Sequence, residues 1–229
     1  MPLFSEDQLI WSPVVANSRM NRERVASGIN SYEQEFRLRP QDHLETIIRE
    51  HGRASWLDLC CGQAKALLQA ARHFEEKGLQ EKVTLEGIDL LDMFQPVDAS
   101  IHCLTLTQQS IVSWIPDRQY DLITCVHGLH YIGDKLQVIA TALSALSDHG
   151  LFIANMDPDN IIIDHSSSAA YLKKCFKAMQ LPYDGRRKIL KKTGAVNIDF
   201  NLTYIGADDS TGPNYTGQEA VTSHYSRRK

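Results

Sequence analysis

This 229-residue chain lacks several features that would assign it to a membrane or to secretion. No stretch approaches the roughly eighteen uncharged apolar residues of a membrane-spanning helix. Residues 1–7 have neither the basic region nor the apolar run of a signal peptide. The net charge of −4 provides no overall attraction to nucleic acid. With 43% hydrophobic residues, the chain is expected to be one cytoplasmic domain with elaborations around a substantial core.

The sequence also lacks the C-x-x-C spacing typical of zinc sites, so no metal site is expected. Its five cysteines are unpaired by spacing and fall mostly in predicted core strands, which fits a reducing compartment. Cys60 and Cys61 are adjacent and are predicted to be buried thiols that pack in the core.

A third missing pattern is the G-x-G-x-x-G loop that cradles phosphates in dinucleotide-binding proteins. Residues 54–62, ASWLDLCCG, nevertheless read as an apolar strand that ends in Asp58 and a glycine turn, followed directly by a helix. Ligands bind where such a strand meets the helix. Because Gly62 is followed by Gln63 and Ala64, we predict a nucleoside ligand without phosphates, which disfavours a nicotinamide-dependent dehydrogenase.

Alternating strands and helices follow this unit. Apolar residues at helical spacing predict a helix over 64–74 with a stop at Gly78, and a capping box at Asp134 and Gln137 predicts another that ends at Gly150. Further strands are predicted over 83–90, 101–106, 120–126 and 151–155, and a helix over 42–50 precedes the first strand. This alternation indicates right-handed crossovers and a mainly parallel α/β sheet.

The order of four motifs resembles the class I S-adenosylmethionine-dependent methyltransferases. The motifs are LDLCCG, then GIDL about thirty residues later, then PDRQYDLITC, then GLHYI, and together they cover roughly residues 40–156. The resemblance implies a Rossmann-like, seven-stranded, mainly parallel sheet with helices on both faces and an antiparallel final strand. It also implies S-adenosyl-L-methionine as the cofactor.

The resemblance assigns cofactor contacts by position. The loop from Asp58 to Ala64, with Cys60 and Gly62, would hold the methionine end of the cofactor. Asp89 would accept hydrogen bonds from the ribose hydroxyls, and Leu90 would lie against the adenine. Gln109 stands where the family usually has an acidic contact to the adenine amino group. The remaining assignments are Tyr32, in the segment that often folds over the cofactor, and His127.

Three residues are candidates for catalysis. His127 and His130 follow the fourth strand, where the family places acceptor contacts, and histidine can move a proton near neutral pH. A hydrogen-bonded structural histidine is the competing interpretation of each. Tyr215 lies in a turn-rich segment, 206–218, which suits either an ordered loop at a pocket mouth or a solvated tail.

The regions outside the core are expected to determine the substrate. Residues 1–52 are predicted to be an N-terminal helical extension that acts as a lid, 53–205 the methyltransferase core, and 206–229 a C-terminal loop and tail. Residues 188–192 and 197–205 are predicted to form a hairpin at the sheet edge. Residues 171–192 hold eight Lys and Arg against one acid, Asp184, which indicates either a solvated face or a site for an acidic or phosphorylated substrate.

The function predicted from these features is a cytoplasmic methyltransferase acting at an O or N atom of a small molecule or peptide. One alternative is a nucleic-acid methyltransferase that acts on tRNA or rRNA. It is not favoured, because VHGLH follows the fourth strand in place of the Asn/Asp-Pro-Pro-aromatic run used for adenine. The other alternative is a catalytically silent partner protein that binds S-adenosylmethionine. The sequence predicts no membrane contact and leaves the oligomeric state open.

Overall fold

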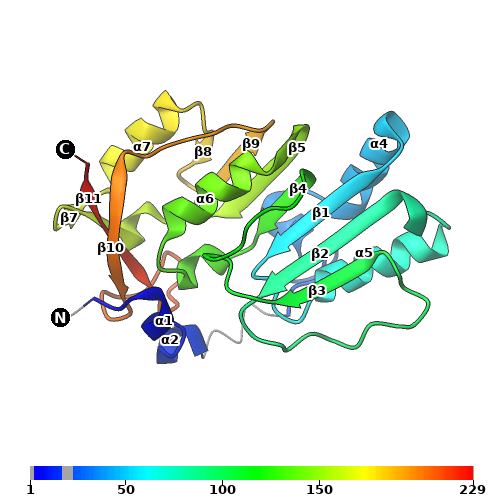
Figure 1. Cartoon of the computed structure of the whole chain (residues 1–229), viewed down its shortest axis with the longest axis horizontal. Helices are drawn as coiled ribbons and strands as arrows, with labels where there is room; N and C mark the ends of the chain where they lie inside the picture. Colours follow the sequence, from blue (N-terminus) through cyan, green and yellow to red (C-terminus); the bar gives the residue numbers. More distant parts are fainter. Residues whose placement is uncertain (1–2, 17–22, 229) are drawn as a thin grey trace.

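The computed structural model describes residues 3–16 and 23–228, and a seven-stranded sheet forms its centre (Figure 1). The sheet order is β3-β2-β1-β4-β5-β9-β8. The five strands from β3 to β5 are mutually parallel, β9 is antiparallel to β5, and β8 is antiparallel to β9, which confirms the predicted fold class. The strands are β1 (Ala54–Leu59), β2 (Val83–Asp89), β3 (Leu104–Gln108), β4 (Tyr120–Cys125), β5 (Leu146–Asn155), β8 (Tyr183–Asp184) and β9 (Ile189–Thr193).

The strand order reverses direction at β1. From β1 the chain proceeds outward to β2 and β3 on one side, and β4 and β5 then lie on the other side. A crevice opens at the carboxyl ends of the strands at such a reversal, and open α/β sheets bind their ligands there. The topology therefore places the candidate site at the ends of β1, β2 and β4.

Both faces of the sheet are buried because successive residues of its central strands enter different cores. Trp56 and Leu122 pack with residues of the helices that precede and follow β1, whereas Leu57 and Ile123 pack with the helix before β5. Helices cover both faces in Figure 1. The helices are α3 (Tyr32–Phe36), α4 (Pro40–His51), α5 (Lys65–Glu76), α6 (Lys135–Ser144) and α7 (Ala169–Ala178), with 3₁₀ turns η2 (Gln80–Lys82), η3 (Gly128–Tyr131) and η4 (Pro158–Asn160).

Two predicted boundaries were wrong. The helix α6 begins as predicted, with the Asp134 side chain accepting a hydrogen bond from the Gln137 N–H, but it ends at Ser144, well before Gly150. The chain enters β5 at Leu146, which pairs with Tyr120 of β4, and after an irregularity the regular pairing resumes at Leu151. The third strand is Leu104–Gln108, displaced toward the carboxyl end from the predicted 101–106.

The predicted hairpin of 188–192 with 197–205 does not form. The first segment becomes β9 and pairs with β5, but the second becomes β10 (Leu202–Asp208), which lies in a separate four-stranded sheet. That second sheet has the order β10-β11-β6-β7, with β11 (Thr222–Arg227), β6 (Ile161–Ile163) and β7 (Ser166–Ser167). Strand β11 falls within the stretch that the sequence predicted to be loop and tail.

Two short helices at the beginning of the chain rest on the second sheet. They are α1 (Glu6–Leu9) and α2 (Pro13–Ala16), and Figure 1 shows them beside β10 and β11. Phe4 pairs with Ala207 through two backbone hydrogen bonds, 2.7 and 3.1 Å long. Residues 17–22, part of the predicted lid, lie outside the described residues. Within the described ranges, no helix combines the length and apolar character needed to cross a membrane.

Candidate functional site

The loop between β1 and α5 has an unusual backbone. Cys60, Gly62 and Ala64 have φ angles of 58°, 59° and 58°, all in the left-handed region. Glycine adopts this conformation at the least cost, so Cys60 and Ala64 each store strain on the order of 1 kcal/mol. Left-handed turns at alternate residues reverse the chain within a short loop, so that α5 begins at Lys65, immediately after Ala64.

Asp89 ends β2 and holds this loop in place. Its Oδ2 accepts a hydrogen bond from the Gly62 N–H at 2.8 Å, and its Oδ1 accepts one from the Leu91 N–H at 3.1 Å. Only 7% of the residue is exposed, and that part faces a cavity. Since each carboxylate oxygen can accept more than one hydrogen bond, Asp89 can still accept bonds from the hydroxyls of a ligand.

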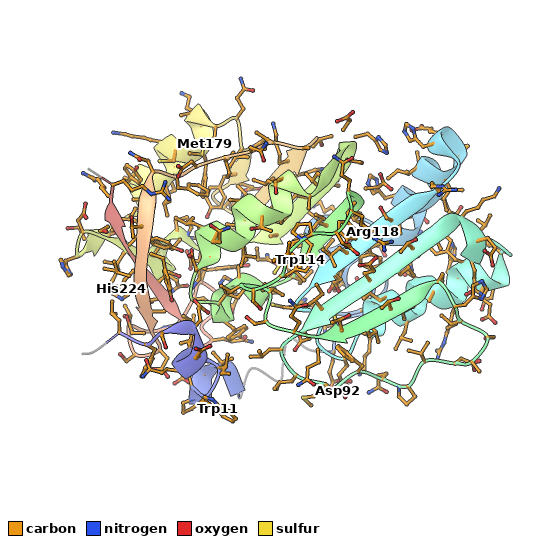
Figure 2. The ribbon with its side chains drawn as sticks, viewed as in Figure 1. Trp11, Asp92, Trp114, Arg118, Met179 and His224 are labelled. Carbon is orange, nitrogen blue, oxygen red and sulfur yellow. The ribbon has the colours of Figure 1, made fainter. Side chains whose placement is uncertain are left out.

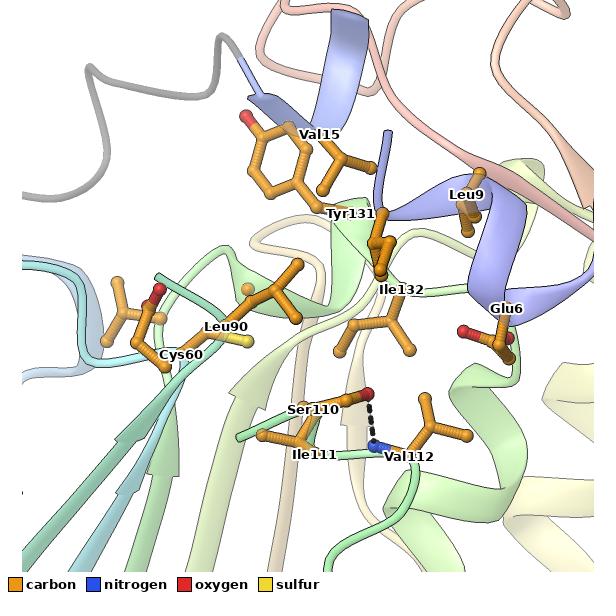
Figure 3. A pocket seen from close by; sticks show the side chains of 14 residues that line it. Glu6, Leu9, Val15, Cys60, Leu90, Ser110, Ile111, Val112, Tyr131 and Ile132 are labelled. Atoms are coloured by element: carbon orange, nitrogen blue, oxygen red, sulfur yellow. Dashed lines mark hydrogen bonds between the residues drawn. The ribbon is translucent and has the colours of Figure 1, made fainter. Parts of the chain in front are cut away.

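The cavity lies at the carboxyl edge of the sheet and contains about 740 Å³ of space, part of it open to solvent (Figure 3). We call its two sides the core wall and the outer wall. The core wall consists of Cys60, Asp89, Leu90, Ser110, Ile111, Val112, Val126 and Gly128. The outer wall consists of Glu6, Leu9, Ile10, Val15, Tyr131 and Ile132.

A family model described as a methyltransferase domain matches residues 30–182, more than half of the chain. The chain belongs to this methyltransferase family. The match confirms the resemblance to methyltransferases seen in the sequence motifs. A comparison of the sequence with curated proteins found no match.

Solved structures similar to this methyltransferase are distant in sequence. They include the N-methyltransferase NodS from Bradyrhizobium japonicum, 11% identical, with 78% of this chain and 97% of NodS covered and a TM-score of 0.41. The amino pentose methyltransferase CalS10 from Micromonospora echinaspora is 16% identical, with 63% and 56% covered and a TM-score of 0.40. The plantazolicin methyltransferase BpumL is 15% identical, with 53% and 49% covered and a TM-score of 0.39. The chain thus spans about half the length of CalS10 and of BpumL.

The core wall fits the cofactor of a methyltransferase. It contains one buried carboxylate, Asp89, which can accept hydrogen bonds from hydroxyls, and the apolar side chains of Leu90 and Ile111, which can contact the faces of a flat ring. Of the predicted cofactor contacts, Cys60, Asp89 and Leu90 line the cavity. Gly62 and Ala64 determine the shape of the loop that carries Cys60 into this wall.

Asp58 and Tyr32 do not line the cavity, contrary to the expectation that Asp58 sits at its mouth. Asp58 is fully buried and accepts hydrogen bonds from the Tyr32 hydroxyl at 2.7 Å and the Thr124 hydroxyl at 2.6 Å. Burial raises the pKa of Asp58 to about 7, although both hydrogen bonds oppose the shift. The pair joins α3 to the centre of the sheet beneath the loop, and a direct contact with the cofactor stays a prediction.

Gln109 also lies outside the cavity lining. Its N–H donates to the Asp89 carbonyl at 2.9 Å, and its side-chain amide donates to the Ser113 carbonyl at 3.4 Å. The residues that reach the cavity are the next three, Ser110, Ile111 and Val112, which the sequence interpretation missed. The adenine contact of Gln109 stays a prediction, and its side chain would have to leave the Ser113 carbonyl to reach the cavity.

The catalytic candidates form a cluster next to the cavity. The His127 and His130 rings lie 5.6 Å apart, and the Tyr215 ring is 6.1 Å from the first and 5.5 Å from the second. In the 3₁₀ turn η3, Gly128 and Tyr131 face the cavity, whereas neither histidine lines it. The structure thus brings all three predicted residues together but directs the histidines to Tyr215.

Two residues that the sequence did not identify connect this cluster. A carboxylate oxygen of Glu35 lies 3.2 Å from His127 Nε2, and the Asn155 amide donates to Glu35 at 2.8 Å and to the Tyr215 hydroxyl at 3.0 Å. Burial alone would raise the pKa of Glu35, but His127, Asn155 and Arg24 lower it to about 2. Glu35 is thus an anion at neutral pH that lies beside the His127 ring. The sequence signal that could have identified Glu35 was its position three residues after Tyr32.

His130 differs from its neighbour. The ring is fully buried, and neither ring nitrogen has a hydrogen-bond partner among the described residues. Burial, with a further contribution from His127, lowers the pKa of His130 well below its usual value. His130 is therefore neutral at physiological pH.

Gly128 packs directly against Cys60 in the core wall, so any side chain at position 128 would clash with Cys60. A Cβ atom on Gly128 would lie 2.5 Å from Cys60 Cβ and 2.8 Å from Cys125 Sγ. We expect Gly128→Ala to lower the free energy of unfolding by about 1–3 kcal/mol through overpacking. Adding Cys60→Gly should restore at least about 1 kcal/mol, because it removes that contact and relieves a left-handed non-glycine residue.

Urea denaturation of the wild type, both single variants and the double variant measures this coupling. If the two single effects simply add in the double variant, the two positions do not share this space.

Proposed function

We propose that this protein transfers a methyl group from S-adenosylmethionine to an O or N atom of a small molecule, in the cytoplasm. The observation that supports this most directly is the cavity at the strand-order reversal, where the Asp89 carboxylate meets apolar side chains. S-adenosylmethionine supplies the methyl group when bound. The protein's own contribution is to position donor and acceptor, which is worth about 7–11 kcal/mol for well-oriented groups.

Cofactor binding would depend on the core wall. In this proposal Asp89 accepts hydrogen bonds from the ribose, Leu90 and Ile111 contact the adenine, and the loop through Cys60, Gly62 and Ala64 faces the methionine end. Arg24, 3.6 Å from Glu35 and mostly buried, is a cation that could attract the methionine carboxylate. Tyr32 supports this region through Asp58.

A base is needed only if the acceptor is protonated at the working pH. His127 is the better candidate for that role, because its Nε2 lies 3.2 Å from a carboxylate oxygen of Glu35, which can orient the ring. His130 is neutral and enclosed, and it is better suited to shape the cluster around Tyr215. The backbone of Tyr215 is held by Asp157, whose Oδ2 accepts from the Tyr215 N–H at 3.0 Å, so the loop that carries it is attached to the core.

The nucleic-acid alternative is weakened by how the basic segment uses its charges. Lys188 lies 2.7 Å from Asp157 and 3.0 Å from Asp159, and Arg187 donates to the Glu35 carbonyl. These cations nearest the site are thus neutralised or occupied within the protein. The silent-partner alternative is distinguished by incubating a cell extract with the protein and labelled donor, since a silent partner adds no label to any compound.

Ligand titration tests the proposed cofactor class. By calorimetry we expect S-adenosylmethionine and S-adenosylhomocysteine to bind, and NAD to bind more weakly than either, because the loop after Asp58 lacks phosphate-cradling glycines. Tighter binding of NAD than of both sulfur compounds would end the methyltransferase proposal.

Asp89→Asn is expected to weaken S-adenosylhomocysteine binding by about 1–3 kcal/mol, the usual range for charge-assisted hydrogen bonds. The matched control is Asp92→Asn, an exposed acid three residues further along that lies at the surface (Figure 2). The control should bind with wild-type affinity. Equal affinities of the two variants would show that Asp89 only supports the loop.

A further inference from the structure

The outer wall of the cavity is held in place by packing and hydrogen bonds to the second sheet. Leu9, Val14 and Val15 pack with Ala207 and Val221 of the second sheet and its connecting loop. The Ser12 hydroxyl donates to Asp209 at 2.6 Å. The helices α1 and α2 are therefore fastened to the second sheet and hold the outer wall at a fixed place opposite the core wall (Figure 3).

Glu6 is the one charged residue of the outer wall, and it is fixed by the backbone. Its Oε1 accepts a hydrogen bond from the Asp134 N–H at 2.8 Å. Gly133 permits this approach, because a Cβ atom there would lie 1.9 Å from Glu6 Oε1. Burial raises the pKa of Glu6, while the Tyr204 hydroxyl and the Asp134 N–H oppose that shift.

The charged side chains that line the cavity determine which ligands can bind there. Among the residues that the structure describes, the cavity lining contains two carboxylates, Glu6 and Asp89, and no lysine, arginine or histidine. An anionic group placed there would lose its hydration without gaining a cationic partner, which is costly. The rest of the outer wall is hydrocarbon apart from the Tyr131 hydroxyl, which donates to Gln218 at 3.0 Å.

We propose that the outer wall is the acceptor subsite of this enzyme and binds a small amine, with its apolar body on Leu9, Ile10, Val15 and Ile132 and its nitrogen directed to Glu6. This rests on the proposed function, in which the core wall holds the cofactor. The subsite excludes acceptors that carry a carboxylate or phosphate, and so separates this protein from an enzyme for acidic substrates.

Three probes that share a phenylethyl group and differ in their polar group test the proposal: 2-phenylethylamine, 2-phenylethanol and 3-phenylpropionate. Each is titrated into the full chain saturated with S-adenosylhomocysteine. The amine is expected to bind about tenfold more tightly than the alcohol, a typical gain from one charge-assisted hydrogen bond, and the acid is expected not to bind. An acid that binds as well as the amine, or an amine that does not bind, would overturn the proposal.

Glu6→Gln keeps the size of the side chain and an acceptor for the Asp134 N–H but removes the charge. This variant should bind the amine only as tightly as it binds the alcohol. Its affinity for the alcohol should equal that of the wild type. Asp7→Asn is the matched control on the same helix, since Asp7 is exposed and outside the lining. An unchanged preference for the amine in Glu6→Gln would refute the role of Glu6.

A second pair of variants tests the apolar part of the wall. Ile10→Asn should weaken both the amine and the alcohol about fivefold or more, because hydrocarbon contact is lost. Trp11→Asn should not, since Trp11 is 82% exposed on the outer side of these helices (Figure 2). If Ile10→Asn binds both probes normally, the acceptor subsite lies elsewhere. Failure of S-adenosylhomocysteine to bind the wild type would instead contradict the proposed function itself.

Discussion

Replacing Lys135 by Met is expected to lower the free energy of unfolding by about 2–6 kcal/mol, because two buried carbonyls lose their hydrogen-bond donor. Lys135 is 1% exposed, at the first turn of α6. Its Nζ donates to the Ile132 carbonyl at 2.7 Å, the Val221 carbonyl at 2.8 Å and the Ser223 hydroxyl at 2.9 Å. Methionine matches the volume but leaves both buried carbonyls without a donor, each costing about 1–3 kcal/mol.

Urea denaturation measures this loss, and Lys174→Met, at an exposed position of α7, is the control, expected to change stability by less than about 0.5 kcal/mol. Because Lys135 connects η3 and α6 to the second sheet, amide exchange should accelerate first in β11 and the preceding loop. A variant as stable as the wild type would show that these three hydrogen bonds contribute nothing net.

The second large effect concerns Asp58 and pH. The unfolded carboxyl titrates near 3.8, and burial raises the pKa of Asp58 in the folded protein to about 7. Between these values the folded protein keeps a proton that the unfolded chain has released, so the stability from this group is complete below about pH 4 and is lost as the pH rises through 7. The expected loss is on the order of 4 kcal/mol.

The measurement is the stability of the wild type minus that of Asp58→Asn, followed by denaturation from pH 4 to 8. This difference should shrink as the pH rises, because the asparagine does not titrate. Asp92→Asn, exposed and unburied, should show a constant difference across the same range. A constant difference for Asp58→Asn as well would mean that Asp58 is ionised throughout and that its burial is compensated.

The central sheet could be predicted because its signals are local. Each core strand is a short apolar run, and a capping residue such as Asp134 or a stop such as Gly78 separates it from its helix. Asp89 was placed correctly because the carboxyl ends of parallel strands share one edge. The ribose contact that the family motif assigns to Asp89 stays a prediction.

The outer wall and the second sheet could not be predicted, because they depend on contacts between distant segments. Strand β6 has three residues and pairs with β11 some sixty residues later, so neither has enough local pattern to reveal its partner. Residues 202–205 have the alternation of an edge strand, but the pattern does not state which sheet they join. Glu6 carries no signal at all, since only the fold brings it to Gly133.

Asp58 and Gln109 show a different limit. A motif fixes the order of residues, whereas burial decides which of them a ligand can reach. Asp58 satisfies its carboxylate with Tyr32 and Thr124, and Gln109 turns its amide to Ser113. In each case the sequence identified the correct loop or strand end but not the side chains that line the cavity.

The position of β11 between β10 and β6 has a consequence for synthesis. The ribosome produces the parallel core strands before the second sheet is complete. Strands β10 and β6 gain their shared neighbour only when β11 has emerged. Only then do Ala207 and Val221 offer a complete surface to α1 and α2, which were made first of all. A nascent chain that stops before residue 222 would therefore lack the strand that joins β10 to β6 beneath the outer wall.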